Sequence, residues 1–553
     1  MADTKRAGAV YPCLDASATR YAEHPEQGWP EVSKSWPQVS RPCSARPLPF
    51  TVVRDMTATE TVSAVIIGAG FAGLAMAREF IRTGIEDFLV LEQARSVGGV
   101  WRENSYPGAA CDVPSAYYSF ADRPNPAWTR RYAGQAQIVE YLRAAADEPE
   151  VRDRIRCGVE VTALRFDEQS GLWTVETADG TVLTARTVIP ATGQLSRPAL
   201  PELPGIAGFA GPSFHSAQWR HDVDLRGKRV AVIGTGASAI QFVPRIQPQV
   251  ADLVVFQRSA PYVLPKPDGG YGEFRRGLFR RAPITLRAER GLWWGLGELW
   301  TFGMLGNRAV SAAVRAAALG HLRARVRSGR LRESLTPDYE IGCKRVLFSN
   351  DYYPAVSQPN VRVVTDRVAE VTATGVRTAD GIEHPADVII YGTGFATQRF
   401  LGPIEVSGRE ALDLHQVWSE GARAYLGMTV PNFPNLFLMY GPNTNLGTGS
   451  IIFMLERQAE YIRQAVRHLL DRPGMSLDVR PDIEDHYDQE IQQRLTTTAW
   501  AACASWYRSA TSARITSNWP GLVSEYARRT RRFGADDFVA IPTRNDRRIG
   551  SGR

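Results

Sequence analysis

Two glycine-rich turns constrain the fold of this chain more than any other feature of its sequence. The first turn follows the apolar residues 65–67 and contains Gly68, Gly70 and Gly73, and a helical pattern continues over residues 74–81. In such a strand–turn–helix unit, the first glycine permits the tight turn, the second lets the backbone approach a pyrophosphate, and the third lets the helix pack against the strand. The N–H groups at the start of the helix face the phosphates. The turn therefore predicts a dinucleotide-binding unit.

An acidic residue ends the next apolar run. Residues 88–91 form a second pattern typical of a buried strand, and Glu92 follows directly. A carboxylate at this position accepts a hydrogen bond from a ribose hydroxyl of the dinucleotide. The turn that comes next contains Gly99 and Trp101, which we assign to the same cofactor site.

The same pattern occurs a second time. The apolar residues 230–233 lead into Gly234 and Gly236, and Ala239 stands in the third glycine position, where alanine is an accepted variant. A second strand, turn and helix of this kind predict a second nucleotide-binding unit.

The residues after the next strand differ between the two units. Gln257 takes the place that Glu92 has in the first unit, and Arg258 and Ser259 follow. A carboxylate would repel a 2′-phosphate, whereas an arginine binds it in a bidentate way. A surface arginine is the simpler alternative for Arg258. We favour FAD in the first site and NADPH in the second, with hydride transfer between them.

The fold class that follows is α/β, with two Rossmann-like nucleotide-binding domains, the second inserted into the first. A length of 553 residues is enough for several domains. Residues 386–395 resemble residues 187–193, so we expect them to return the chain to the FAD side. The predicted division is an N-terminal extension over 1–55, a first segment of the FAD domain over 56–200, the NADPH domain over 201–384, and a second segment of the FAD domain with the C-terminal region over 385–553.

A helical insertion is predicted within the second domain, over residues 268–335. This stretch is rich in arginine and has aromatic and alanine-rich helical patterns. It could shape a substrate pocket or touch a membrane surface, but helices that simply pack on the domain are the favoured interpretation.

The charge of the chain does not indicate a nucleic-acid partner. The formal net charge is +7 and the pI is about 9.1, but the basic residues are spread along the chain and match no RNA- or DNA-binding module. We expect the charge to favour solubility and anionic cofactors, with no nucleic acid bound.

The cysteines and the most apolar segment indicate where in the cell we expect the protein. The six cysteines are scattered without CxxC spacing, which predicts neither a metal site nor a disulfide framework and favours reduced thiols. We identify no signal peptide, and the most apolar segment, residues 292–305, is too short to span a bilayer and carries Glu298. We therefore expect a soluble cytoplasmic protein without stable membrane insertion.

A linker motif between the two glycine turns resembles a known family. Phe209, Gly211, His215 and Trp219 match the Phe-x-Gly-x-x-x-His-x-x-x-Trp fingerprint of type I Baeyer–Villiger monooxygenases, which are class B flavoprotein monooxygenases. The usual fingerprint ends in Pro or Asp, and Arg220 stands there instead. The similarity extends over about residues 60–525.

The resemblance implies roles for several further residues. Arg345 matches the family's active-site arginine, and Asp112 matches the acid that positions it, although spacing alone would make Asp112 a turn or N-cap aspartate. Lys344 resembles the family's second contact to the NADPH 2′-phosphate, beside Arg258 and Ser259.

Two assignments keep an alternative. His215 is associated with linker movement, or is simply a buried, satisfied histidine, and Trp506 is assigned to the substrate pocket, with a structural tryptophan as the alternative.

The expected function is that of an NADPH- and O2-dependent flavin monooxygenase. By resemblance, a C4a-peroxyflavin inserts one oxygen next to the carbonyl of a small-molecule ketone and gives an ester or lactone. Sulfur or nitrogen oxygenation by the same flavin peroxide is the enzymatic alternative. A flavin-bound redox sensor is the non-enzymatic alternative, against which Gly234, Gly236, Arg258 and Lys344 argue. The identity of the ketone and the oligomeric state stay open.

Overall fold

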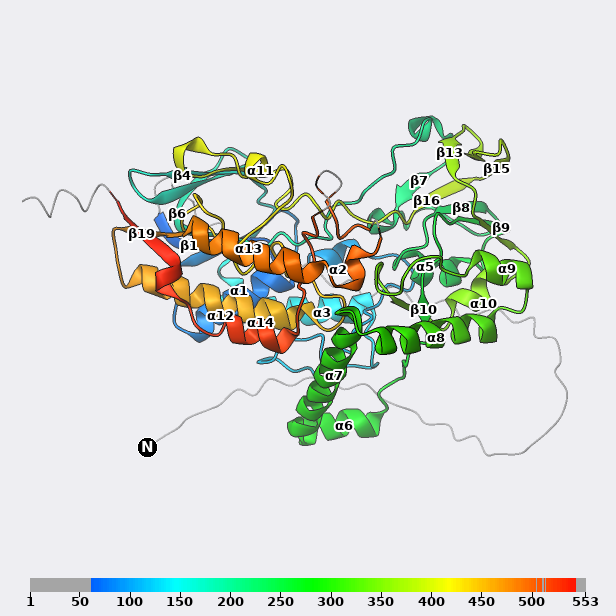
Figure 1. Cartoon of the computed structure of the whole chain (residues 1–553), viewed down its shortest axis with the longest axis horizontal. Helices are drawn as coiled ribbons and strands as arrows, with labels where there is room; N and C mark the ends of the chain where they lie inside the picture. The colour runs from blue at the N-terminus through cyan, green and yellow to red at the C-terminus, as the bar shows by residue number, and fades with distance from the viewer. Residues whose placement is uncertain (1–60, 504, 510–511, 513, 544–553) are drawn as a thin grey trace, which may run out of the picture. The chain divides into compact units, whose positions relative to one another are not determined.

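A computed structural model describes residues 61–503, 505–509, 512 and 514–543 of the chain. The predicted extension over residues 1–55 lies outside these residues. The described residues are built around two β-sheets, one near each side of Figure 1. The nucleotide-binding units predicted from the sequence begin in these sheets, β1 in the first and β8 in the second.

The first sheet has seven strands in the order β17-β4-β5-β6-β1-β2-β3. Strand β1 lies inside it and pairs in parallel with β2 and β6. Its last four residues are buried, which explains why this run is apolar without alternation. The strands are β1 (Thr61–Ile67), β2 (Phe88–Glu92), β3 (Ile155–Cys157), β4 (Val161–Asp167), β5 (Leu172–Thr177), β6 (Val182–Pro190) and β17 (Glu405–Ser407).

The second sheet has five strands in the order β12-β9-β8-β16-β7, and every neighbouring pair is parallel. Strand β8 lies in its middle and ends at the second glycine turn. The strands are β7 (Ser213–His215), β8 (Arg229–Ile233), β9 (Asp252–Phe256), β12 (Val361–Val364) and β16 (Val388–Tyr391).

The helices of the first domain pack on its sheet and on one another. Helix α1 follows the first glycine turn and packs along α12, and its residues Leu74, Met76 and Phe80 share one core with Ile462 and Val466 of α12. Figure 1 shows α1, α12 and α14 side by side below the first sheet. The helices are α1 (Phe71–Arg82), α2 (Val100–Glu103), α3 (Gln135–Ala146), α4 (Pro149–Arg152), α11 (Leu414–Val417), α12 (Ile451–Leu470), α13 (Pro481–Leu495) and α14 (Val523–Arg529).

The second domain carries the predicted helical insertion. Helix α5 (Ala239–Ile246) follows the second glycine turn, and α10 (Tyr352–Val356) packs on it. Residues 268–335 contain α6 (Glu273–Arg281), α7 (Pro283–Met304), α8 (Arg308–Arg325) and α9 (Gly329–Ser334). Shorter sheets are formed by β10 (Val263–Leu264) with β11 (Leu347–Phe348), by β13 (Val368–Val371), β14 (Gly375–Thr378) and β15 (Glu383–Pro385), and by β18 (Met475–Val479) with β19 (Phe538–Pro542).

The predicted domain boundary at residue 384 needs correction. Strand β16 lies after that boundary, yet it pairs with β8 and β7 of the second sheet. The resemblance between residues 386–395 and 187–193 is real, because each segment ends beside the glycine turn of its own sheet. A Cβ on Gly234 would lie 2.4 Å from the carbonyl oxygen of Gly392, and a Cβ on Gly68 would lie 2.8 Å from that of Ala191. The chain returns to the first sheet only after Tyr391, where β17 pairs with β4.

None of the helices built from described residues combines the length and the apolar character that crossing a bilayer requires.

Candidate active site

The first glycine turn forms a cradle that side chains would fill. A Cβ on Gly73 would lie 1.8 Å from the carbonyl oxygen of Gly68, so only glycine allows α1 to start this close to β1. Gly70 precedes the first residue of α1, and a Cβ on Gly99 would lie 3.1 Å from its Cα. The predicted glycines therefore leave backbone without side-chain cover at the start of a helix, which suits the pyrophosphate of a dinucleotide.

Glu92 lies at the end of β2 and its carboxylate is buried beside this turn. It accepts hydrogen bonds from the backbone N–H groups of Ala69, at 2.8 Å, and Ala94, at 3.0 Å. Arg102 lies 3.3 Å from the same carboxylate. Glu92 is thus held next to the cradle, in the position from which such an acid reaches a ribose.

Trp101 connects this cradle to a cavity. Its indole N–H donates to the hydroxyl of Tyr118 at 3.0 Å, and both residues line the cavity wall. Burial raises the pKa of Tyr118 well above its ordinary value, so this phenol stays protonated.

The second glycine turn packs as closely against a crossing strand as the first, but alanine takes its third glycine position. A Cβ on Gly392 would lie 3.3 Å from the Cβ of Ala239, at the third position of the turn. Alanine is tolerated in that third position because the crossing strand has glycine opposite it. Gly236 is the middle glycine, and α5 begins directly after the turn.

Three residues predicted to meet a 2′-phosphate lie together beyond β9. The ammonium group of Lys344 donates to the hydroxyl of Ser259 at 2.8 Å and lies 4.5 Å from the centre of the Tyr339 ring. Burial and the positive charge of Arg258 lower the pKa of Lys344. Two cations that repel each other next to a hydroxyl form a site for an anion.

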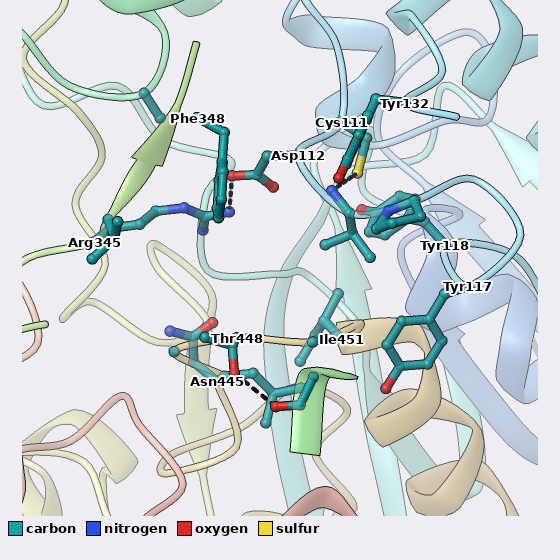
Figure 2. A pocket seen from close by; sticks show the side chains of 18 of the residues that line it. Cys111, Asp112, Tyr117, Tyr118, Tyr132, Arg345, Phe348, Asn445, Thr448 and Ile451 are labelled. Atoms are coloured by element: carbon teal, nitrogen blue, oxygen red, sulfur yellow. Dashed lines mark hydrogen bonds and ion pairs between the residues drawn. The ribbon is translucent and has the colours of Figure 1, made fainter. Parts of the chain in front are cut away.

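Arg345 and Asp112 form an ion pair across the two domains. The guanidinium nitrogen of Arg345 lies 2.5 Å from a carboxylate oxygen of Asp112. Figure 2 shows the Arg345 side chain extending toward Asp112 at the wall of the pocket. The sequence placed these residues in separate segments, and the fold brings them into contact.

The charges of this pair are mutually stabilised. The Asp112 carboxylate raises the pKa of Arg345 above its ordinary value, so the guanidinium keeps its charge. Burial acts to raise the pKa of Asp112, but the charge and the hydrogen bond of Arg345 lower it overall. Lys266 is a further cation near Asp112, with its ammonium group 3.0 Å from the carbonyl oxygen of Cys111. Lys266 was not predicted from the sequence, which offered no motif around it.

The ion pair opens onto a cavity of about 670 Å³. Residues from the first cradle, from α5, from the α7 helix of the insertion and from the C-terminal region all contribute to its wall. Its lining is mostly apolar and contains many aromatic side chains: Trp101, Tyr106, Tyr117, Tyr118, Tyr132, Trp293, Trp300, Phe348, Phe395, Tyr440, Trp500 and Tyr507.

Trp506 does not take its predicted place in this wall. Within the described residues of the chain, Trp500 and Tyr507 line the cavity, whereas Trp506 packs against Tyr507 with ring centres 4.2 Å apart and the rings inclined by 46°. The sequence motif located the right segment but not the right side chain, because the orientation of a loop residue has no periodic signal. Tyr440 and Tyr507 were also missed; burial raises the pKa of both phenols, and the charge of Arg345 offsets only part of this.

The linker fingerprint lies along the edge strand of the second sheet. A Cβ on Gly211 would lie 2.3 Å from the carbonyl oxygen of Asp387 and 2.9 Å from the Phe209 ring, so this position admits no side chain. Trp219 packs between Phe214 and Phe242. The fingerprint thus fixes the strand before the second glycine turn, and Arg220, its atypical end, forms an exposed pair with Asp222.

His215 is buried at the end of β7. Its Nδ1 accepts a hydrogen bond from the N–H of Ala217 at 3.1 Å. Burial lowers its pKa, so the imidazole is neutral at pH 7. His215 does not line the cavity within the described residues, and the structure does not make it an acid or base for the reaction.

The expectation of reduced thiols without a disulfide is wrong at one pair. Cys343 and Cys503 are joined by a disulfide, with Cα atoms 5.9 Å apart and 160 residues between them in sequence. Cys343 directly precedes Lys344 and Arg345, and Cys503 lies between Trp500 and Tyr507. Spacing could not predict this bond, because the fold alone brings the two segments together. Cys111 and Cys157 are free.

The sequence of the chain is similar to one family model and to named relatives. A family model described as pyridine nucleotide-disulphide oxidoreductase matches residues 65–262. A Baeyer–Villiger monooxygenase of Pseudomonas aeruginosa is 42% identical over 480 residues, which cover 86% of this chain and 91% of the relative. A Baeyer–Villiger monooxygenase of Streptomyces coelicolor is 44% identical over 485 residues, which cover 87% of this chain and 93% of the relative.

Solved structures show the same architecture. The crystal structure of OTEMO in complex with FAD and NADP has a TM-score of 0.78 with 28% sequence identity, and the match covers 87% of this chain and 99% of that chain.

Proposed function

The chain belongs to the family of Baeyer–Villiger monooxygenases, and we propose that Arg345, held by Asp112, stabilises the negative charge that develops during oxygen insertion. It is an FAD-dependent monooxygenase that uses NADPH and O2. The balanced reaction converts a carbonyl compound, O2, NADPH and a proton into an ester or lactone, NADP+ and water.

We assign the cofactors to the two cradles. Gly68, Gly70, Gly73 and Glu92 would hold FAD, since their backbone and carboxylate suit a pyrophosphate and a ribose. FAD, when bound, supplies the activation of O2 with electrons from NADPH.

The second cradle would hold NADPH. Gly234 and Gly236 leave room for the pyrophosphate, and Lys344, Ser259 and Arg258 form the anion site for the 2′-phosphate. The positive charges of Lys344 and Arg258 would favour NADPH over NADH, which lacks that phosphate.

Arg345 acts as a fixed positive charge. Its pKa is raised by Asp112, so it neither donates nor accepts a proton during turnover. It stabilises negative charge on the attacking oxygen and on the carbonyl oxygen, and this effect is stronger in a water-poor cavity than in bulk water. Asp112 positions the guanidinium through the 2.5 Å contact.

The cavity favours an apolar ketone as substrate. Its wall is rich in aromatic side chains, and its polar groups, among them Arg345, Asp112 and Asn445, are few. In Figure 2, Asn445 and Thr448 lie on the opposite side of the pocket from Asp112. A substrate would place its carbonyl near Arg345 and its apolar body against the aromatic wall.

The contact between Arg345 and Asp112 at the cavity carries this proposal. Purified enzyme with FAD and NADPH, supplied with a panel of ketones, sulfides and amines under isotopically labelled O2, should form esters that contain one labelled oxygen. Arg345→Ala should lower ester formation at least about 100-fold, as expected for the loss of a group that stabilises the transition state. NADPH should still bind to this variant with unchanged affinity.

Two results would contradict the proposal. Unchanged ester formation by Arg345→Ala would remove the arginine from the chemistry. Products oxidised only at sulfur or nitrogen, with every ketone left intact, would instead support heteroatom oxygenation.

A further inference from the structure

The helical insertion carries large apolar side chains that are exposed to solvent. Phe274 of α6 is 88% exposed and Ile284 of α7 is 67% exposed, and Leu278 lies between them in the sequence and is also exposed. Phe274 lies at the start of α6, Leu278 lies further along α6, and Ile284 lies in the first turn of α7. Figure 1 shows α6 and the adjoining end of α7 at the periphery of the fold, while the other end of α7 meets α8.

The exposed apolar surface continues along one side of α7. Large apolar residues recur there at helical spacing, with the small residues Ala288, Gly291 and Gly295 between them. We call these exposed residues the α7 stripe: Ile284, Leu292, Leu296, Leu299 and Phe302.

Polar contacts from other positions of α7 anchor it to the FAD domain. Arg290 lies 3.3 Å from Glu456 of α12 and donates to the carbonyl oxygen of Ser119 at 2.6 Å. Glu298 accepts hydrogen bonds from Val523 and Ser524 at the start of α14. These contacts determine which side of the helix faces the domain. The α7 stripe is therefore exposed by the way the helix is held.

Helix α6 and the first turns of α7 also carry several arginines. Within the described residues, Arg275 and Arg276 pair with Glu289 and Glu273 of the insertion. No described carboxylate forms a salt bridge with Arg280, Arg281 or Arg287, and all three are exposed. The hairpin of α6 and α7 thus carries the exposed Phe274, Leu278 and Ile284 together with three arginines that form no described salt bridge.

We infer that the α6–α7 hairpin docks on the surface of a membrane that contains anionic lipids. Phenylalanine, leucine and isoleucine would enter the boundary between headgroups and acyl chains, and the arginines would contact the lipid phosphates. Docking of this kind lies within the interface and does not need a spanning helix. It goes beyond the packed-helix interpretation favoured by the sequence, which accounts for only one side of α7.

Charge favours a lipid surface over a second copy of the chain. Two such hairpins brought face to face would place Arg280, Arg281 and Arg287 near their like-charged counterparts. Glu273, the exposed acid of the hairpin, already pairs with Arg276. An anionic bilayer offers opposite charge to all three unpaired arginines.

The stripe also reaches the mouth of the cavity. Leu296 and Leu299 are exposed on α7 and at the same time line the cavity. A docked enzyme would therefore have the opening of its pocket near the lipid, from which a lipophilic ketone could enter. This last step rests on the proposed function, whereas the docking itself does not.

Vesicle sedimentation tests the docking without turnover. The full-length FAD-loaded protein should sediment with vesicles of phosphatidylcholine and phosphatidylglycerol in equal parts at low salt, and much less with phosphatidylcholine alone. Ile284→Ser combined with Phe274→Ser should lower partitioning roughly tenfold, since less apolar surface is buried. Arg280→Gln combined with Arg281→Gln should also lower it roughly tenfold, and high salt should do the same in the wild type.

Matched substitutions elsewhere provide the controls. Ile382 is 55% exposed on the β14–β15 turn, so Ile382→Ser removes the same side chain from another surface. Arg531 and Arg532 are adjacent and exposed, so Arg531→Gln with Arg532→Gln removes the same charge. Both control proteins should partition like the wild type.

Three outcomes would overturn the inference. One is the absence of sedimentation with anionic vesicles, and another is equal loss in the hairpin and control variants. The third is a wild-type dimer that Ile284→Ser converts to a monomer, which would assign the stripe to a second copy. Activity on a water-soluble ketone should be unchanged in the hairpin variants, so a failure of docking and a failure of the proposed function are distinguishable.

Discussion

At the scale of single residues, the site depends on charges that are held in place. Arg345 contributes a permanent positive charge, and Asp112 decides where that charge lies. Asp112 keeps its own negative charge because Arg345 lowers its pKa. In the role we propose, neither residue exchanges a proton, so the contribution of the pair to catalysis is electrostatic and depends on position.

Asp112→Asn tests this positional role. The amide keeps the shape but removes the charge that holds Arg345, so ester formation should fall roughly tenfold while NADPH is still consumed. The measured quantity is the ratio of ester formed to NADPH oxidised, which should decrease. Asp222→Asn, which removes the acid of the exposed pair with Arg220, should leave the ratio unchanged. An unaltered ratio in Asp112→Asn would contradict the role.

The same pair predicts a pH dependence of stability. The pKa of Asp112 in the folded protein lies below its ordinary value of 3.8, so the ion pair stabilises the fold at pH values above that value. Its contribution is lost as the pH falls through the lowered pKa. Chemical denaturation between pH 2 and pH 6 should therefore show a smaller acid-induced loss of unfolding free energy in Asp112→Asn than in the wild type. Equal losses in the two proteins would contradict the ion-pair contribution.

Lys344 can be tested by the choice of nicotinamide cofactor. Lys344→Gln should weaken NADPH binding roughly tenfold, since a charge-assisted contact to the 2′-phosphate is lost. The affinity for NADH should change little, because NADH has no phosphate there. Equilibrium titration of both nucleotides measures this difference, and Lys228→Gln at an exposed position is the control. Equal weakening for both nucleotides would place Lys344 outside the phosphate site.

At the scale of elements, the cavity wall depends on segments that are distant in sequence. The Cys343–Cys503 disulfide ties the loop before Arg345 to the C-terminal segment that carries Trp500 and Tyr507. The two halves of the wall are thus covalently linked two residues before Arg345. Reduction should let the C-terminal segment move away from the pocket.

Reduction of this disulfide should lower stability and weaken substrate binding. A crosslink between residues 160 positions apart restricts the unfolded chain, and removing it should cost up to about 4 kcal/mol. Dithiothreitol should therefore lower the Tm and raise the KM for the ketone in the wild type. Cys343→Ser should show both changes without reductant and no further response to it, whereas Cys157→Ser should behave like the wild type. An equal response to dithiothreitol in Cys343→Ser would exclude the bond.

At the scale of the whole molecule, the two nucleotide-binding domains meet beside the ion pair. Gln241 of α5 donates to the carbonyl oxygen of Ala110 at 2.9 Å and accepts from the hydroxyl of Tyr106 at 2.9 Å. A Cβ on Gly108 would lie 2.8 Å from the Gln241 carbonyl oxygen, so the turn that carries Asp112 approaches α5 closely. This contact sets the position of one cofactor cradle relative to the other.

Gln241→Leu should disturb the transfer of hydride between the cradles. The side chain keeps its approximate size but loses its hydrogen bonds to Tyr106 and Ala110, worth about 1 kcal/mol each. The rate of flavin reduction by NADPH under anaerobic conditions should fall roughly tenfold, with NADPH affinity unchanged. Gln249→Leu, an exposed position just after α5, is the control. A normal reduction rate would show that this contact does not align the cofactors.

The sequence alone determined the chemistry of this protein to a large extent. The two glycine turns, Glu92, and the change to Arg258 predicted two different nucleotide sites, because the steric demands of a tight turn and the charge of a phosphate act on neighbouring residues. The fingerprint around Trp219 then indicates the family, and that resemblance implies the roles of Arg345 and Asp112. Local geometry is determined by local sequence, and these features are local.

Only the tertiary structure decided which distant segments meet. Strand β16 joins the second sheet although its sequence resembles the end of β6, since hydrogen-bonded pairing depends on the partner that the fold places alongside. The tertiary fold also forms the Cys343–Cys503 bond, keeps Trp506 out of the cavity wall and leaves the α7 stripe exposed. Pairing, enclosure and exposure arise from packing between segments far apart in the chain, and no short stretch of sequence contains them.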